Sequence, residues 1–130
     1  MADNVKTIKE CFDAFARGDA AFIVARVTDD VDWRPPGTAT PYGGNYKGPQ
    51  GAGQFFAKIG GAVEVTKWEP KHVVASGSAV IAWGHWEGKA RPTGKSFASD
   101  WGMEFGFKGD KISSFRVVED TAHVAAAFRP

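Results

Sequence analysis

The residue best placed for chemistry in this sequence is Glu119, an acid near the end of a strongly alternating apolar segment. Glu119 follows Val117 by two residues and Phe115 by four. Because the side chains of a strand alternate between its two faces, this spacing places all three on one face. A carboxyl group among apolar neighbours loses solvation, which raises its pKa toward the range that is useful for moving protons. The sequence therefore predicts that Glu119 is an acid–base group in an apolar cavity.

Aromatic and aliphatic side chains from other segments are expected to line the same cavity. The two preceding segments alternate in the same way and place Trp86 and Trp101 on the side of Phe115, while Trp33 comes from an earlier strand. Three indoles around one hollow would form walls suited to a planar or apolar ligand. The predicted ligand contacts are Phe12, Phe15, Trp33, Val63, Val65, Trp86, Ser99, Trp101, Met103, Phe115, Val117 and Val124.

Both assignments have a simpler alternative. The last strand can twist near its end, so that Glu119 reaches solvent or pairs with an arginine. The tryptophans can fill the interior as an ordinary core, because aromatic side chains supply much of the area that any core buries. Gly84 and Gly88, which leave room beside Trp86, favour a cavity over a filled core.

The other reactive residue types do not form a recognisable site. Cys11 has no evident cation nearby to lower its pKa and is predicted to be a small core residue. Ser99 has no histidine partner, so its predicted role is a hydrogen bond to a ligand. His72 is expected about four residues out of step with His85, too far for the two to share an ion. No glycine-rich segment carries the lysine of a phosphate loop. The sequence therefore predicts neither a metal nor a cofactor.

Length and composition are those of an ordinary globular domain. The chain has 130 residues, of which 43% are hydrophobic and 24% charged, and its net charge is +1. This length can bury a core without disulfides, so one domain over residues 1–130 is expected. The basic residues are scattered, which argues against a nucleic-acid partner. One cysteine, no apolar leader and no run long enough to span a bilayer predict a cytoplasmic protein without a membrane partner.

The elements that must position Glu119 begin with helices. Asp3 or Asn4 can cap a first helix, which Gly18 ends and whose apolar stripe has helical spacing: Val5, Ile8, Phe12 and Phe15. Asp19 caps a second short helix, which carries Phe22, Ile23 and Val27. A short strand follows over residues 30–34 and stops at Pro35-Pro36.

The rest of the chain is predicted to be a loop, a helix, four strands and a last helix. Residues 37–53 are rich in glycine and proline and are expected to be largely loop, with Tyr42 and Tyr46 at the rim of the cavity. The expected helix covers about residues 50–59, and the strands lie near 62–74, 79–90, 96–107 and 111–119, before a helix capped by Asp120. Helices followed by an antiparallel meander indicate an α+β fold, in which helices close the hollow side of a cone-shaped curved sheet.

Six fragments in this order resemble the SnoaL-like branch of the nuclear transport factor 2-like superfamily. That branch includes ketosteroid isomerases, polyketide cyclases and limonene epoxide hydrolase. The likeness covers essentially the whole chain and is specific for a fold rather than a reaction, because this fold serves many reactions. The fragments are Arg17–Asp19, Thr28–Trp33, Tyr46–Gly51, Pro92–Ser96, Gly109–Ile112 and Phe115–Thr121.

The resemblance does not carry over the catalytic residues of two well-known members. The arginine and two aspartates with which the epoxide hydrolase activates water correspond here to Gly84, Trp86 and Val117, and its asparagine corresponds to Pro35. That reaction is therefore not expected.

For the ketosteroid isomerase, the base and the two oxyanion donors correspond to Pro35, Cys11 and Met103. A thiol is a poor hydrogen-bond donor and a thioether is none, so these side chains cannot hold an enolate oxygen.

The opposite face of the predicted sheet has a different character. Trp83, His85 and Glu87 lie on the far side of the strand that carries the inward Trp86, and Asp100 and Glu104 lie on the far side of the next strand. An outer face with a tryptophan, glycines and charges suits a subunit contact. Relatives commonly pair through this surface, so the resemblance implies a two-fold homodimer.

Two functions of different classes follow from the sequence. The first is an enzyme that binds a small, largely apolar molecule and moves a proton with Glu119, in an isomerisation, cyclisation or dehydration that needs no cofactor. The second is a non-catalytic module that binds such a molecule. The absence of the residues that known relatives use for chemistry favours the second.

Overall fold

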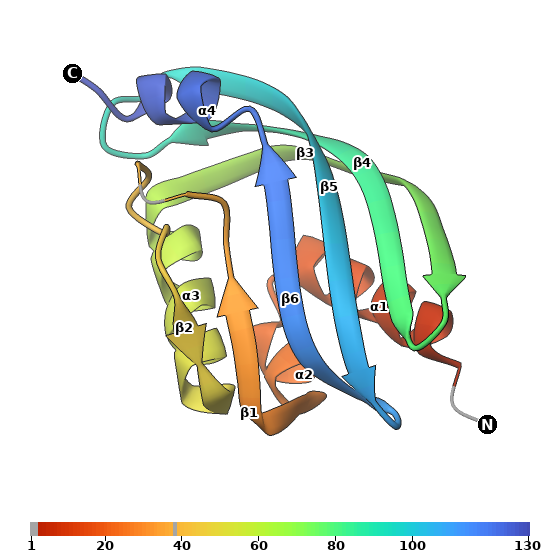
Figure 1. Cartoon of the computed structure of the whole chain (residues 1–130). Helices are drawn as coiled ribbons and strands as arrows, with labels where there is room; N and C mark the ends of the chain where they lie inside the picture. Colours follow the sequence, from red (N-terminus) through yellow and green to blue (C-terminus); the bar gives the residue numbers. More distant parts are fainter. Residues whose placement is uncertain (1–2, 38) are drawn as a thin grey trace.

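A strongly curved sheet and four helices make up the structure, a computed structural model that describes residues 3–37 and 39–130 (Figure 1). The helices α1–α3 lie on the hollow side of the sheet, and α4 crosses its end beyond β6. This α+β arrangement confirms the predicted fold class. In chain order the elements are α1 (Asn4–Ala16), α2 (Ala20–Val24), β1 (Val27–Arg34), β2 (Tyr46–Lys47), α3 (Gly48–Ala62), β3 (Val63–Ser76), β4 (Ala79–Ala90), β5 (Ser96–Lys108), β6 (Lys111–Glu119) and α4 (Thr121–Ala127).

The sheet has six strands in the order β2-β1-β6-β5-β4-β3. Strands β3 to β6 form the predicted antiparallel meander, while β1 pairs with β6 in parallel and so joins the N-terminal part of the chain to the last strand. Trp33 of β1 therefore lies beside Phe115 of β6, as register partners. The pairing brings together the segments that carry Trp33, Trp101 and Glu119.

Aspartate side chains fix the starts of three helices, as predicted. Asp3, Asp19 and Asp120 each accept a hydrogen bond from a backbone N–H of the first helical turn, at 3.0, 3.2 and 3.0 Å. For α1 the capping residue is Asp3 rather than Asn4.

The assignment of Val27 to the second helix is wrong. Helix α2 ends at Val24, and Val27 is the first residue of β1, where it pairs with Ile112. The Arg26 guanidinium donates to the carbonyl of Phe22 at 2.7 Å and lies over its ring. The chain thus leaves the helix a turn earlier than the apolar spacing suggested.

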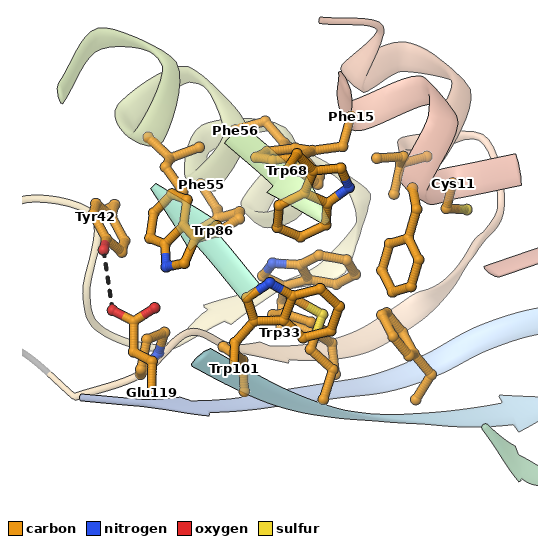
Figure 2. Close-up of a pocket in the computed structure, with 18 residues that line it drawn as sticks. Cys11, Phe15, Trp33, Tyr42, Phe55, Phe56, Trp68, Trp86, Trp101 and Glu119 are labelled. Carbon is orange, nitrogen blue, oxygen red and sulfur yellow. Dashed lines mark hydrogen bonds between the residues drawn. The ribbon is translucent and has the colours of Figure 1, made fainter. Parts of the chain in front are cut away.

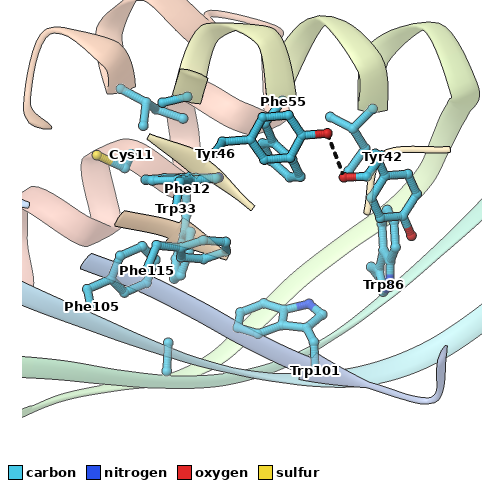
Figure 3. Close-up of a cluster of buried hydrophobic side chains, with 14 of the residues drawn as sticks. Cys11, Phe12, Trp33, Tyr42, Tyr46, Phe55, Trp86, Trp101, Phe105 and Phe115 are labelled. Carbon is cyan, nitrogen blue, oxygen red and sulfur yellow. Dashed lines mark hydrogen bonds between the residues drawn. The ribbon is translucent and has the colours of Figure 1, made fainter. Parts of the chain in front are cut away.

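Helix α3 begins earlier and ends later than the predicted residues 50–59. It starts at Gly48, whose φ of +71° favours glycine, and Pro49 occupies the first turn, where its missing N–H costs nothing. The side chains of α3 that face the sheet join the aromatic core (Figure 3).

Strand β3 contains two irregularities that change which residues face the hollow. Its register against β4 shifts between Val65 and Lys67, and again between Pro70 and His72. One extra residue in a strand reverses the alternation beyond it. Trp68 consequently faces inward, opposite Trp86, although regular alternation from Val63 and Val65 would turn it outward.

Candidate functional site

The hollow of the sheet contains a cavity of about 80 Å³, enclosed by aromatic side chains from helices and strands (Figure 2). Its walls come from α1, α2, α3, the segment after β1, and strands β1, β3, β4, β5 and β6. The lining residues are Cys11, Phe12, Phe15, Ile23, Trp33, Pro36, Tyr42, Phe55, Phe56, Ile59, Trp68, Trp86, Trp101, Met103, Phe105, Phe115, Val117 and Glu119.

Most of the predicted contacts are brought together here. Glu119 and eight of the twelve predicted ligand contacts line the cavity, namely Phe12, Phe15, Trp33, Trp86, Trp101, Met103, Phe115 and Val117. Val63 and Val65 instead line a second hollow of about 250 Å³ beside α1, α2 and α3, and Val124 is buried outside the cavity lining. The inward residues of β4, β5 and β6 therefore lie where alternation placed them.

Ser99 faces inward but does not line the cavity. Its hydroxyl donates to the Asp100 carbonyl at 2.7 Å and accepts from the backbone N–H of Asp120 at 3.0 Å. It thus ties β5 to the residue that caps α4. Ser99 therefore lies outside the cavity lining and donates its proton within the chain, unlike the ligand contact that the sequence predicted.

Stacked rings give the walls of the cavity their shape. The rings of Trp68 and Trp101 stack at 4.9 Å, and those of Trp33 and Phe115 at 4.2 Å. The Trp101 ring lies directly over Gly84 on the neighbouring strand, where a Cβ atom would overlap it. A glycine at this position is therefore what allows the indole to lie flat on the sheet.

Glu119 is the one ionisable carboxyl group among the lining residues. It is the last residue of β6, paired with Trp101 of β5, and it points into the cavity (Figure 2). Burial raises its pKa from 4.5 to about 7, an effect that the Tyr42 hydroxyl and the Trp86 indole N–H partly oppose by favouring the carboxylate. Near neutral pH the group can therefore both accept and donate a proton.

Tyr42 is a site residue that the sequence analysis placed wrongly, at the rim. Its side chain is 1% exposed, and its hydroxyl donates to Oε2 of Glu119 at 3.4 Å. Burial, together with the nearby Glu119 carboxylate, raises the pKa of the Tyr42 hydroxyl. Tyr42 is thus a neutral hydrogen-bond donor in the cavity.

Tyr46 is also buried rather than on the rim. Its hydroxyl donates to the carbonyls of Tyr42 and Gly43, each at 3.2 Å, so that it holds the chain that positions Tyr42 (Figure 3). Its ring packs edge-on against Phe55 of α3.

Several lining residues had no assigned role in the sequence analysis. Trp68 was missed because a register shift in β3 reverses the alternation, and Tyr42 because its loop has no periodicity from which burial can be judged. Phe55 and Phe56 lie within the predicted helix of about residues 50–59 but were not assigned to the site. Their helical spacing beside Ile59 was a signal that could have placed them in the cavity wall.

Cys11 lines the cavity and is buried, and burial raises the pKa of its thiol to about 11. At neutral pH the side chain is therefore a thiol and not a nucleophilic thiolate. This agrees with its predicted role as a small core residue.

The histidines are closer in register than expected. His72 pairs with Trp83, two residues from His85 rather than about four. Within residues 3–37 and 39–130, no three His, Cys, Asp or Glu side chains come close enough together to hold a metal ion. No helix in this part of the chain is long and apolar enough to cross a membrane.

Comparison with known proteins places the chain in a family. The model of the SnoaL-like domain matches residues 8–115. A nuclear transport factor 2-like (NTF2-like) protein from Burkholderia xenovorans is 30% identical, with a TM-score of 0.87 over 97% of this chain and 95% of that one. Comparison with curated proteins gives no significant match.

Two more distant structures share the fold and contain small molecules. TerC, co-crystallised with polyporic acid, is 21% identical, with a TM-score of 0.80 over 96% of this chain and 97% of that one. A protein of ketosteroid isomerase-like fold from Catenulispora acidiphila, in complex with trimethylamine, is 13% identical, with a TM-score of 0.79 over 98% and 93%. The chain is a member of the SnoaL-like domain family, with an NTF2-like fold.

Proposed function

We propose that the protein binds a small, largely apolar molecule in the aromatic cavity and moves a proton on it with Glu119. The observation that carries this proposal is the position of the Glu119 carboxyl group, buried among rings with Tyr42 as its hydrogen-bonding partner. The distant relatives that hold polyporic acid and trimethylamine support small-molecule binding by this fold.

The reaction class that fits is a proton transfer such as isomerisation, cyclisation or dehydration. A general acid–base group works best when its pKa lies near the working pH, and burial brings the pKa of Glu119 to about 7. Each of these reactions removes a proton from one atom of the substrate and returns one to another. A single carboxyl group can serve both steps.

Deuterium exchange tests this activity without knowledge of the natural substrate. We expect the protein in D₂O to accelerate incorporation of deuterium next to the carbonyl of cyclohexanone, measured by mass spectrometry, because Glu119 can remove and replace that proton. Glu119→Gln keeps the size of the side chain and should abolish the acceleration. Equal exchange by the two proteins would refute the role of Glu119.

A non-catalytic binding module is the second candidate. Cys11 and Met103 line the cavity at the positions where the resemblance to ketosteroid isomerases would place oxyanion donors, and neither is an effective donor. Saturable binding of cyclohexanone without any accelerated exchange would favour this function over the first.

We also infer a homodimer formed through the outer face of β4 and β5. Trp83 is 47% exposed there and lies against Gly102, and Val118 of β6 extends the exposed apolar area beside it. His85 bridges the acids Asp100 and Glu87 next to this patch. Sedimentation should give twice the chain mass at micromolar concentration, whereas a monomer would contradict the inference.

A further inference from the structure

Four tryptophans of the cavity wall have buried indole N–H groups that make no hydrogen bond to the described part of the chain: Trp33, Trp68, Trp86 and Trp101. Trp33, Trp86 and Trp101 are 2%, 3% and 1% exposed, and none of their Nε1 atoms has an acceptor there. Buried donors are normally paired, because an unpaired one has given up its hydrogen bond to water without a replacement. All four belong to the same cavity, so what occupies it decides whether they are paired.

Two of these donors lie toward the polar end of the cavity. In both close-ups the indole nitrogen of Trp101 is on the edge of the ring that faces Trp86 and Tyr42 (Figures 2 and 3). The Trp86 indole N–H lies toward the Glu119 carboxyl group and favours its carboxylate form, but the two groups do not reach hydrogen-bonding geometry, so this donor can still bond a ligand. The Trp101 ring packs against Gly84, where a Cβ atom would overlap it.

The opposite end of the cavity carries no carboxyl or hydroxyl group of the described residues, and the indole there is that of Trp68, beside Phe12 and Phe15. Cys11, Phe12 and Phe105 line this end, and the Cys11 thiol is a weak donor. A ligand is therefore offered two indole donors beside Glu119 and Tyr42, and largely apolar surface toward Cys11. A hydrocarbon would leave the indole donors unpaired wherever it lay.

We propose that Trp86 and Trp101 select the ligand by donating their indole N–H groups to a neutral oxygen acceptor, such as a carbonyl oxygen. The ligand's apolar body then extends toward Cys11. This rests on the proposed function, because it takes the same cavity as the binding site. It adds the residues that decide which small molecules bind, and it assigns them a preference for acceptors over hydrocarbons of equal size.

A pair of probes with nearly the same shape tests the proposal. Cyclohexanone has a carbonyl oxygen where methylenecyclohexane has a CH₂ group, and NMR of the ¹⁵N-labelled protein reports each indole N–H separately. We expect cyclohexanone to bind roughly five- to tenfold more tightly, as one or two added hydrogen bonds imply, and to shift the Trp86 and Trp101 signals downfield. Methylenecyclohexane should give no such downfield shift. The exposed Trp83 is an internal control whose signal should not move with either probe.

Conservative variants connect the preference to these two side chains. Trp86→Phe and Trp101→Phe keep an aromatic ring but remove the N–H donor. In each variant the affinities for cyclohexanone and methylenecyclohexane should become more nearly equal. Trp83→Phe is the matched control and should keep the full preference.

The outcomes separate this inference from the proposed function. Equal affinity for both probes in the unmodified protein would overturn the selection by indole donors while leaving cavity binding intact. An undiminished preference in both Phe variants would overturn it as well. Failure of both probes to bind would contradict the proposed function, and this inference with it.

Discussion

The two faces of β4 and β5 consist of alternate residues of the same strands, yet they place similar side chains in very different surroundings. On the inner face Trp86 and Trp101 are buried and Glu119 stands among rings. On the outer face Trp83 is half exposed, and both ring nitrogens of His85 meet carboxylates, Asp100 at 2.9 Å and Glu87 at 2.8 Å.

The pKa is raised for an ionisable group on each face, but for different reasons. Burial raises the pKa of Glu119, because the apolar surroundings disfavour its charged form. Hydrogen bonds that the His85 ring donates to the carboxylates of Glu87 and Asp100 raise the pKa of His85, because they favour its charged form. The inner group can thus donate or accept a proton near neutral pH, whereas the outer one is bound between two carboxylates. The environment of a side chain, rather than its type, sets its chemistry here.

The largest difference between the faces should be in stability. Trp101→Ala removes a buried ring that stacks on Trp68 and should lower the free energy of unfolding by about 3–5 kcal/mol. Trp83→Ala on the outer face should lower the free energy of unfolding of the monomer by no more than about 1 kcal/mol, at a protein concentration too low for the proposed dimer to form. Urea denaturation of the two variants measures both values. Equal losses would contradict the assignment of the faces.

The next largest effect is a dependence of the free energy of unfolding on pH, which comes from the titration of Glu119. The folded state raises its pKa from 4.5 to about 7, so the folded protein holds the proton more tightly than the unfolded chain. The stability from this group is complete below pH 4.5 and is lost as the pH rises through about 7, by up to about 3 kcal/mol.

Glu119→Gln should remove this part of the pH dependence, because glutamine does not titrate. Urea denaturation of both proteins at pH 4.5 and 8 gives the comparison. A drop in stability of the same size in the two proteins would show that Glu119 titrates with an ordinary pKa.

A smaller effect on stability is expected where β5 meets α4. Ser99→Ala removes the acceptor of the Asp120 backbone N–H and should cost about 1–2 kcal/mol of stability. It should leave the relative affinity for cyclohexanone and methylenecyclohexane unchanged, because Ser99 does not line the cavity. A large change in that preference would show that Ser99 contacts the ligand.

The smallest effect belongs to the outer face. Asp100→Asn should lower the pKa of His85 toward its ordinary value, because one of the two carboxylates that favour the imidazolium is lost. NMR titration of the His85 ring measures the change. Since His85 is near the surface, the stability should change by less than about 1 kcal/mol.

The alternation of side chains between the two faces of each strand made part of the site predictable from the sequence. Strands β4, β5 and β6 pair without a register shift around Trp86, Trp101 and Glu119. Every second residue of these strands therefore faces the same side of the sheet, and the sequence is enough to tell which side that is. The helix starts were also readable, because an aspartate that accepts from the first turn is a local signal.

The rest of the site depends on features that leave little local signal. The register shift that turns Trp68 inward is a consequence of how β3 pairs with β4, which is set by the whole sheet. Tyr42 is buried because Tyr46 holds its backbone and α3 supplies Phe55 beside it. The partner of Glu119 therefore became visible only in three dimensions.

The most direct test of the account is the pKa of Glu119 itself, measured by following its ¹³C-labelled side-chain carboxyl signal through a pH titration. We predict a midpoint near 7, because the group lies among aromatic rings with little access to water. A midpoint near the 4.5 of an unperturbed glutamate would show that the carboxylate is well solvated and would contradict its role as the acid–base group of the cavity.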